Sequence, residues 1–301
     1  MKMRFFLLAL WILPLGLARA QTPDIASVKG NDVFEQTIQA VELLGGMDRF
    51  VKPGNAVGIL VNSDFRNRGA YVDPEVVIAT IKMAFDAGAT DIVFLQPIKP
   101  DYWTRTPLEP EYREMIARTR EIKENQFPAV FSEDVFVKVP KVEGAVSVKD
   151  LELVKELFEV DVFINIPIAK HHATTILTNS MKNLMGLNTR ASNVKFHLDG
   201  PSRNDPEFLA QCIADLYLVR PPDLIISDVT YCFVTNGPNG PGDVVSPLKV
   251  VTGTDPVAVD TYCAQQIGFL PEDVLTIQKG YEIGLGEKDL SKLSILEVNN
   301  E

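Results

Sequence analysis

Cysteine and histidine, the two residue types that most often build metal and redox centres, are scarce in this sequence. Its 301 residues include 3 cysteines and 3 histidines, and no two cysteines form a Cys-x-x-Cys pair. The usual ligand spacings of zinc ribbons and iron–sulfur clusters are therefore missing. The sequence also lacks the Gly-x-Gly-x-x-Gly, P-loop and Gly-x-Ser-x-Gly motifs, so dinucleotide, nucleoside triphosphate and serine-hydrolase functions have no motif support and any cofactor stays unknown.

The three thiols, Cys212, Cys232 and Cys263, are widely spaced along the chain. We expect them to be buried as ordinary small apolar side chains, because cysteine is among the most buried residue types. Cys263 also shares a helical face with Val259 and Ile267. One disulfide remains as the alternative if the protein enters an oxidising compartment.

Basic side chains are also few. Lys and Arg number 29 against 40 Asp and Glu, which gives a formal net charge of −11. A chain this acidic repels nucleic acid phosphates, and no Lys/Arg cluster compensates, so we do not expect nucleic acid as a partner. Beyond the N-terminal segment no apolar run is long enough to cross a membrane as a helix.

The first 20 residues, MKMRFFLLALWILPLGLARA, have the pattern of a secretory signal peptide. Lys2 and Arg4 precede an apolar run over residues 5–17, which is too short to span a bilayer comfortably; a retained anchor is the alternative. No Arg-Arg pair precedes the run and no cysteine follows the expected cut, so we predict Sec-type export and cleavage before Gln21. The product would be periplasmic or extracellular, without a stable membrane anchor and with a net charge of −14.

Residues 21–301 alternate apolar runs with amphipathic segments, as βα units do. This predicts an α/β fold: a mostly parallel sheet with helices on both faces, in a Rossmann-like layered architecture, forming one unit or two lobes of about residues 21–150 and 151–301. We predict strands at residues 55–61, 91–95, 160–166, 223–227 and 248–251, with edge strands in 128–139. Helices are predicted at residues 74–87, 109–125, 149–158, 175–185, 206–219 and 256–267, with a last helix from residue 271.

In a mostly parallel sheet, ligands usually bind at the carboxyl ends of the strands, where loops and helix N-termini meet. This rule selects the polar residues that directly follow the predicted strands. They are Asn62, Asp64, Gln96, Lys170, His171, His172, Asp228, Thr254 and Asp255.

All three histidines, His171, His172 and His197, fall within 27 residues. Histidine suits proton transfer near neutral pH and is the commonest metal ligand, so all three are candidate catalytic or metal-binding residues. Their spacing matches no known metal template. Adjacent side chains on an extended backbone point to opposite sides, so at most one of His171 and His172 should face the site unless a turn redirects them. The alternative is one buried, hydrogen-bonded histidine and one exposed histidine.

The predicted helix over residues 175–185 has an apolar stripe and an opposite face with Asn179 and Lys182. Helical side chains lean toward the N-terminus, which brings Lys182 back toward the strand end. There it could orient an anionic substrate, or act as an acid or base if desolvated. An ordinary surface helix would show the same two faces.

A second group of candidate binding residues surrounds the helix over 256–267. Asp255 is expected mainly to cap that helix, while Gly253 and Thr254 allow an anion to approach its N-terminus. Asp260 could face the site, although a solvated carboxylate is the simpler expectation. Asn236 belongs to the turn-rich loop TNGPNGPGD and is a further candidate.

The segments VKPGNAVGILVN, DPEVVIATIKMAFDAGATDIV, INIPIAKHHATTILTNSMKNLMGL, RPPDLIISDVTYCFVTNGPNGPG and VVTGTDPVAVDTYCAQQIG resemble the family catalogued as domain of unknown function 362. The resemblance covers about residues 51–269 and implies an architecture and a site, but no reaction. Two strand ends depart from the family pattern: Leu60-Val61-Asn62 stands where Lys-Pro-Asn is common, and Leu95-Gln96-Pro97 where Gly-Asp-Ser is common. The ferredoxin-like cysteine cluster of some members is absent.

The same region bears a fainter likeness to the nickel-pincer lactate racemases. In that comparison His171 or His172, Lys182 and His197 would take the places of a strand-end histidine, a helix lysine and a further histidine. The likeness concerns the fold and the position of the site.

Two functional hypotheses follow. The first is an exported enzyme acting on a small anionic molecule, with His171 or His172 as acid, base or metal ligand, Lys182 as electrostatic anchor, and His197 and Asp228 in support. The second is an exported protein that binds a ligand or a metal without catalysis. The sequence leaves the substrate and the oligomeric state open.

Overall fold

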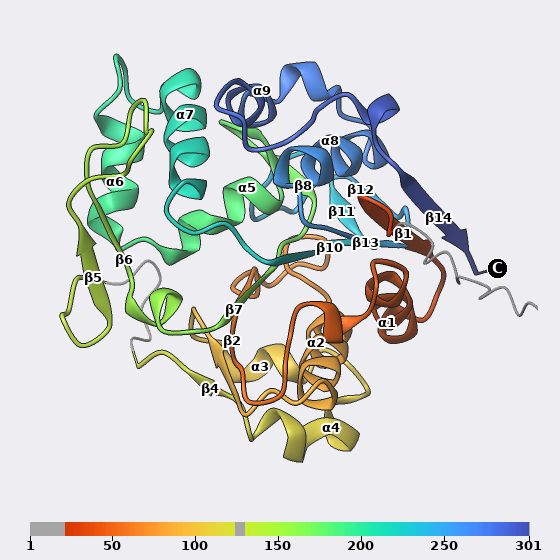
Figure 1. Cartoon of the computed structure of the whole chain (residues 1–301). Helices are drawn as coiled ribbons and strands as arrows, with labels where there is room; N and C mark the ends of the chain where they lie inside the picture. Colours follow the sequence, from red (N-terminus) through yellow and green to blue (C-terminus); the bar gives the residue numbers. More distant parts are fainter. Residues whose placement is uncertain (1–21, 124–129, 301) are drawn as a thin grey trace, which may run out of the picture.

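A computed structural model describes residues 22–123 and 130–300. The signal-peptide prediction over residues 1–20 lies outside the described residues. Within them, one eight-stranded sheet has the order β14-β1-β13-β10-β7-β2-β3-β4 and runs through the middle of the molecule (Figure 1). Its strands are β1 (Ile25–Lys29), β2 (Ala56–Val61), β3 (Asp91–Phe94), β4 (Arg120–Glu121), β7 (Val162–Ile166), β10 (Leu224–Val229), β13 (Lys249–Gly253) and β14 (Ile295–Asn299).

Helices cover both faces of the sheet, as the sequence predicts. In Figure 1, α1 to α4 lie below the sheet, and α5 and α7 to α9 lie above it. Neighbouring strand residues supply opposite layers: Ile225 packs in the upper core and Ile226 in the lower one. The α-helices are α1 (Val33–Leu43), α2 (Pro74–Asp86), α3 (Pro100–Trp103), α4 (Glu109–Ile116), α5 (Ser180–Asn183), α6 (Arg190–Leu198), α7 (Pro206–Tyr217), α8 (Pro256–Gln266) and α9 (Leu275–Glu282).

The helix starts follow local chemistry. Asp73, Asp205 and Asp255 each precede a proline at the first helical position, and each accepts a hydrogen bond from a backbone N–H of the first turn. Proline lacks a backbone N–H, and it is tolerated at this position because an N–H there would have no intrahelical partner. Short 3₁₀ segments fill the remaining turns: η1 (Met47–Arg49), η2 (Lys155–Phe158), η3 (Leu184–Leu187), η4 (Pro271–Asp273) and η5 (Leu290–Lys292).

The direction of β13 decides which of the predicted site residues lie at the same edge of the sheet. Within the described residues, β13 pairs antiparallel with both β10 and β1, while the other neighbouring pairs of the large sheet are parallel. The carboxyl ends of β2, β3, β7 and β10 therefore share one edge of the sheet. The carboxyl end of β13 lies at the opposite edge.

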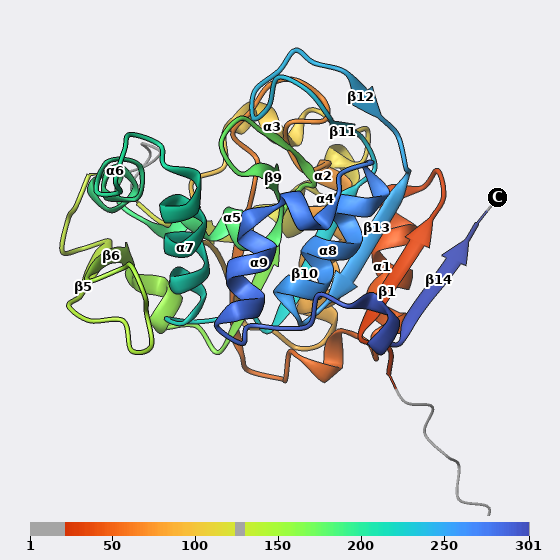
Figure 2. The same ribbon diagram turned by 90° about the horizontal axis from the view of Figure 1, so that it is seen from above.

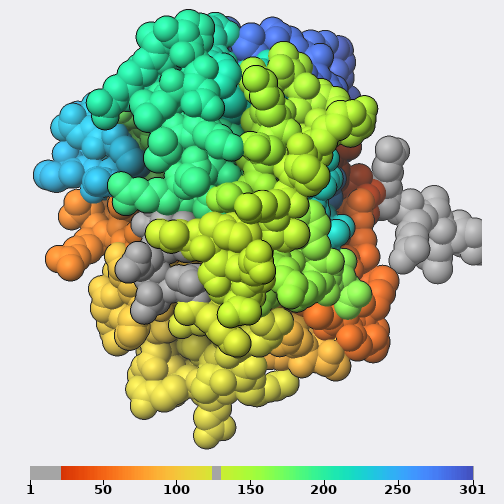
Figure 3. Space-filling view, turned by 90° about the vertical axis from the view of Figure 1, so that its left-hand side faces the viewer, coloured from red at the N-terminus to blue at the C-terminus, as the bar shows by residue number. Residues whose placement is uncertain are grey.

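Three small two-stranded sheets surround the large one: β5 (Phe136–Val139) with β6 (Leu151–Val154), β8 (Lys170–His172) with β9 (Ile176–Thr178), and β11 (Cys232–Phe233) with β12 (Val244–Val245). The β5–β6 hairpin and α6 stand beside α7, at the end of the molecule away from β14 (Figure 2). In the space-filling view, the light-blue loop before β12 lies against the orange loop after β2 (Figure 3). Asn67 Nδ2 donates to the Asn239 carbonyl there at 2.8 Å.

Several predicted elements are wrong. Residues 149–158 form β6 and η2 instead of a helix, because Leu151 and Leu153 alternate into the core beside β5. Residues 175–185 form β9 and then α5, so the predicted helix is replaced by a hairpin followed by one helical turn. The helix expected from residue 109 ends at Ile116, and its last two expected residues lie outside the described residues, as do the first two of the range 128–139. Strands β1 and β14 were not predicted.

The thiols Cys212, Cys232 and Cys263 are buried and free, in line with their expected apolar role. Among residues 22–123 and 130–300 no helix is both long and apolar enough to cross a membrane.

Candidate functional site

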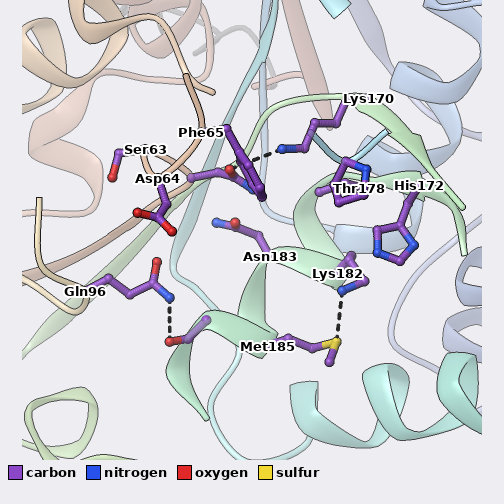
Figure 4. A pocket seen from close by; sticks show the side chains of 13 residues that line it. Ser63, Asp64, Phe65, Gln96, Lys170, His172, Thr178, Lys182, Asn183 and Met185 are labelled. Atoms are coloured by element: carbon purple, nitrogen blue, oxygen red, sulfur yellow. Dashed lines mark hydrogen bonds between the residues drawn. The ribbon is translucent and has the colours of Figure 1, made fainter. Parts of the chain in front are cut away.

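A polar pocket of about 110 Å³ opens at the shared carboxyl edge of the parallel strands. The loops after β2 and β3 form one wall, and the β8–β9 hairpin with α5 and η3 forms the other (Figure 4). The pocket is lined by Asn62, Ser63, Asp64, Phe65, Gln96, Lys170, His172, Thr178, Lys182, Asn183, Met185, Gly186 and Pro238.

The β8–β9 hairpin decides which histidine enters this pocket. Lys170 pairs with Thr178, His171 with Leu177 and His172 with Ile176. Side chains alternate along a strand, so Lys170 and His172 share one face and His171 takes the other. Lys170, His172 and Thr178 line the pocket accordingly, and His171 does not.

His172 presents a hydrogen-bond donor to the pocket. Its Nδ1 accepts from the backbone N–H groups of Thr174 at 3.2 Å and Thr175 at 3.3 Å. Burial, followed by the nearby charges of Lys182 and Lys170, lowers the pKa of His172 to about 3. The ring is therefore neutral at physiological pH, and since Nδ1 accepts, its proton resides on Nε2.

Lys182 is the least neutralised cation of the site. Its Nζ contacts the thioether sulfur of Met185 at 3.1 Å, and no ion pair involves it among the described residues (Figure 4). A thioether is only a weak acceptor and carries no charge. Burial lowers the pKa of Lys182 from 10.5 to about 8. The ammonium thus sits in a site that stabilises its charge poorly.

Lys170 supplies a second, completely buried cation. Its Nζ donates to the Ala70 carbonyl and to Asn62 Oδ1 at 3.4 Å, and lies 3.9 Å from the centre of the Phe65 ring. Burial first, and the charge of Lys182 second, lower its pKa well below the usual value. Burial thus disfavours the charged form of both lysines, and a bound anion would favour it.

The pocket's one carboxylate among the described lining residues belongs to Asp64. Asp64 is paired with Lys99, which also donates to the Asp64 backbone carbonyl at 3.1 Å. The charge of Asp64 raises the pKa of Lys170, but burial lowers that pKa by more. Asp64 therefore leaves the charge of Lys182 largely uncompensated.

Helix α5 holds Lys182 in place through buried polar contacts. Asp260, 1% exposed, accepts the backbone N–H groups of Ser180 at 2.8 Å and Met181 at 3.1 Å. Asn183 Nδ2 donates to Asn165 Oδ1 at 2.8 Å. Burial raises the pKa of Asp260 to about 7. The expectation of a solvated Asp260 is wrong, because the residue lies beneath α5.

The other two histidines do not share this pocket, so the expected meeting of three imidazoles with Lys182 is corrected. His171 Nδ1 accepts the Gly237 N–H at 3.0 Å, and its ring meets Phe269 edge-on at 6.2 Å. His197 lies on α6 with Nδ1 3.0 Å from Asn204 Oδ1. Burial and the charge of Lys182 lower the pKa of His197, which shows that His197 lies near the pocket. Its side chain does not line the pocket.

No group of three or more His, Cys, Asp or Glu side chains within residues 22–123 and 130–300 could hold a metal ion. The candidate metal ligands His171, His172 and His197 therefore do not form a site by themselves. The alternation along β8 separates the first two, and the third comes from a different helix.

Two predicted binding residues are buried structural groups. Asp228, 1% exposed, accepts from the N–H and hydroxyl of Thr230 and from the Asp73 N–H at 2.7 Å. Asn179 is fully buried, and its Oδ1 accepts from the Ser227 hydroxyl at 2.6 Å. Neither residue lines the pocket. Asp228 joins β10 to the loops at Thr230 and Asp73, and Asn179 joins the start of α5 to β10.

Asn236 also lies outside the pocket. Its backbone has a φ of 53°, and its Nδ2 donates to the Pro241 carbonyl at 3.2 Å. It shapes the loop from which Pro238 reaches the pocket.

Gly253, Thr254 and Asp255 lie at the other edge of the sheet, because β13 runs antiparallel to β10. Asp255 caps α8 as expected, accepting the Ala258 N–H at 2.9 Å. It also accepts the Glu287 N–H at 2.8 Å. The anion site expected around these residues is therefore separate from the Lys182 pocket.

Sequence reasoning missed much of the lining. Thr178 lay inside an expected helix. Gly186 lies within η3, and its carbonyl accepts a hydrogen bond from Gln96 Nε2 at 2.7 Å. Phe65 lies four residues beyond the correctly predicted end of β2, and applying the strand-end rule to the whole following loop would have included it. The missed lining residues are Ser63, Phe65, Thr178, Asn183, Met185, Gly186 and Pro238.

The fold and pocket define a mostly parallel α/β protein with a lysine-containing polar pocket at the carboxyl ends of its strands. Comparison with known families narrows this class. The chain belongs to the family described as Domain of unknown function (DUF362), whose model matches residues 57–265. The resemblance stated from the sequence is thereby confirmed.

Among curated proteins, the chain is 25% identical over 254 residues to the thylakoid-associated protein sll1697 of Synechocystis sp., covering 81% of this chain and 73% of that protein. Among solved structures, it is similar to the lactate racemase apoprotein from Thermoanaerobacterium thermosaccharolyticum, with a TM-score of 0.44 and 12% identity over 67% of this chain and 50% of that one. A protein from Thermotoga maritima gives a TM-score of 0.41 and 11% identity, over 84% and 60%. This chain thus spans half to three fifths of those two structures, at similarities too low to transfer a function.

Proposed function

We propose that this protein is an exported enzyme that acts on a small anionic molecule bound in the Lys182 pocket. The observation that carries the proposal is the Lys182 ammonium, which has a thioether contact and no carboxylate partner among the described residues. A cation in a partly desolvated pocket gains most from a bound anion. The volume of the pocket, about 110 Å³, accommodates an anion of a few heavy atoms.

The neighbouring groups fit the same ligand. His172 offers Nε2–H as a neutral donor, and Lys170 adds a buried amino group whose charged form a bound anion would favour. Thr178 lines the pocket, and its buried hydroxyl lacks a hydrogen-bond partner among the described residues. A bound carboxylate could accept from these groups. The proton-transferring group would be Lys182, because His172, with a pKa of about 3, stays neutral.

Calorimetric titration with acetate and glyoxylate tests the anion site. Removing one charged hydrogen-bond donor costs about 1.5–3 kcal/mol, so Lys182→Met should weaken binding by about 10- to 100-fold. Affinity in the unaltered protein should fall as the pH rises through about 8, where Lys182 loses its charge. Lys195→Met, which removes an exposed lysine paired with Asp150, is the matched control. Equal binding by Lys182→Met and the unaltered protein would remove the basis of the proposal.

The second candidate function is non-catalytic binding of the same kind of anion. The altered strand end at Gln96 favours it, because the Gln96 amide is already bonded to the pocket wall. Proton NMR of small acids incubated with the protein in deuterated water separates the two functions. Exchange of a carbon-bound proton that is lost in Lys182→Met supports the enzyme, whereas binding without exchange or turnover supports the binding protein.

Export is the remaining part of the proposal. It rests on the charge and apolar pattern of residues 1–20. Mass spectrometry of the protein isolated from its native cells should give Gln21 as the first residue. An intact Met1 on the mature protein would contradict export by this signal.

A further inference from the structure

Lys182 differs chemically from an ordinary ion-paired lysine. An ammonium bonded to a carboxylate is held in its charged form, but the Met185 sulfur offers neither charge nor a strong acceptor. Burial lowers the pKa of Lys182 to about 8. About one tenth of the molecules therefore carry the free amine at pH 7. Desolvation of a lysine in this way is one arrangement that activates an amine as a nucleophile.

The surroundings of the amine select a kind of reaction partner. Lys170 and the His172 Nε2–H lie in the same pocket and suit a carboxylate, which would hold the rest of the molecule. The pocket, with a volume of about 110 Å³, has space for a molecule of several heavy atoms. A partner of this size has room for a carboxylate and one adjacent reactive carbon.

We propose that Lys182 forms an imine with the carbonyl carbon of a small oxo acid, whose carboxylate binds toward Lys170 and His172. This inference rests on the proposed anion site and names its substrate class. It requires no metal and no redox partner, because every group in the step belongs to the lysine or to the oxo acid.

The step balances as a condensation. The Nζ lone pair attacks the carbonyl carbon, and the C=O π electrons move to oxygen, which takes a proton from the nitrogen to give a carbinolamine. The nitrogen lone pair then expels this oxygen, which leaves as water after a second protonation. The net change converts the ammonium and the oxo acid into a protonated imine and one water. The Thr178 hydroxyl, which lines the pocket and lacks a hydrogen-bond partner among the described residues, can hydrogen-bond the oxygen during addition.

Reductive trapping tests the proposal directly. The full chain is incubated with glyoxylate or pyruvate and sodium cyanoborohydride at pH 7, digested, and mapped by peptide mass spectrometry. We expect one reduced adduct, located on Lys182, to form at least tenfold faster than adducts on exposed lysines. Adducts spread evenly over surface lysines, or none at Lys182, would overturn the proposal.

Two matched variants sharpen the result. Lys182→Arg keeps the positive charge but cannot form the imine, so trapping in the pocket should disappear; Lys195→Arg should trap as the unaltered protein does. The peptide map of the unaltered protein decides the question even if Lys182→Arg folds poorly.

Acetate separates this inference from the anion site itself, because it has the carboxylate but lacks the reactive carbonyl. If acetate and glyoxylate bind and glyoxylate is not trapped, the imine is wrong while the anion site stands. If glyoxylate is trapped on Lys182 and acetate slows the trapping, both are supported. If neither acid binds and nothing is trapped, both fail.

Discussion

Replacing Lys182 with methionine should make the protein more stable at neutral pH while weakening its anion binding. Burial lowers the pKa of Lys182 from 10.5 to about 8, which sets an upper limit of about 3 kcal/mol on the cost of its charge, at about 1.4 kcal/mol per pKa unit. The side chain keeps some contact with solvent. Screening there reduces the expected gain to roughly 1–2 kcal/mol.

The sign of the pH dependence follows from the same pKa. Below about pH 8 Lys182 is charged in both the folded and the unfolded chain, so the folded state bears the full cost. Between about pH 8 and 10.5 the unfolded chain binds more protons at this lysine, so the stability of the unaltered protein rises with pH through this group. The advantage of Lys182→Met should therefore shrink by roughly 1–2 kcal/mol between pH 7 and pH 10.5.

Urea denaturation of both proteins at these two pH values measures the difference, and other titrating groups cancel because they are common to both. Lys195→Met is the control, since its exposed ammonium is paired with Asp150 and its removal relieves no buried charge. A less stable Lys182→Met at pH 7, or a stability difference that does not change with pH, would refute the claim that Lys182 carries an uncompensated charge.

Three further predictions concern the groups around the pocket. Asp260→Asn should lower the free energy of unfolding by about 1–3 kcal/mol in urea, because the side chain accepts two backbone N–H groups of α5. In the unaltered protein, Asp260 lowers stability as the pH rises from about 4 to 7, because the folded Asp260 has a pKa of about 7 and keeps a proton that the unfolded chain has lost. Asp260→Asn should remove this fall. Gly186→Ala should alter anion affinity in calorimetry with little loss of stability, because its Cβ would meet Gln96 Nε2 at 2.2 Å and this flexible amide can turn away; unchanged affinity would show that Gln96 does not shape the pocket. Gly237→Ala should destabilise the fold by more than about 2 kcal/mol in thermal or urea unfolding, since its Cβ would lie 1.7 Å from the His171 carbonyl oxygen, and near-native stability would contradict this packing.

Local sequence signals predicted the sheet core and the starts of α2, α4, α7 and α8. The buried strands β2, β7 and β10 consist mainly of apolar residues, and an aspartate before a proline marks the start of α2, α7 and α8. These signals act over a few residues, so the sequence displays them directly. The strand-end rule then correctly selected Asn62, Asp64, Lys170 and His172 as pocket-lining residues.

Long-range pairing could not be predicted in the same way. The apolar run of β13 is the same for either strand direction, yet its antiparallel pairing with β10 moves Asp255 to the far edge of the sheet. The segment Ile176–Thr178 contains residues suited to a helix or a strand, and its pairing with β8 decides between them. The β8–β9 hairpin also directs His171 away from the pocket. The errors in the candidate site therefore come from strand pairing between distant residues.

A crystal structure of the protein soaked with glyoxylate tests the central claim most directly. We predict density for the carboxylate within hydrogen-bond distance of His172 Nε2 and beside Lys170, with the carbonyl carbon next to Lys182 Nζ. Glyoxylate bound elsewhere, or a pocket that stays free of it at concentrations where calorimetry detects binding, would contradict the assignment of this pocket as the anion site.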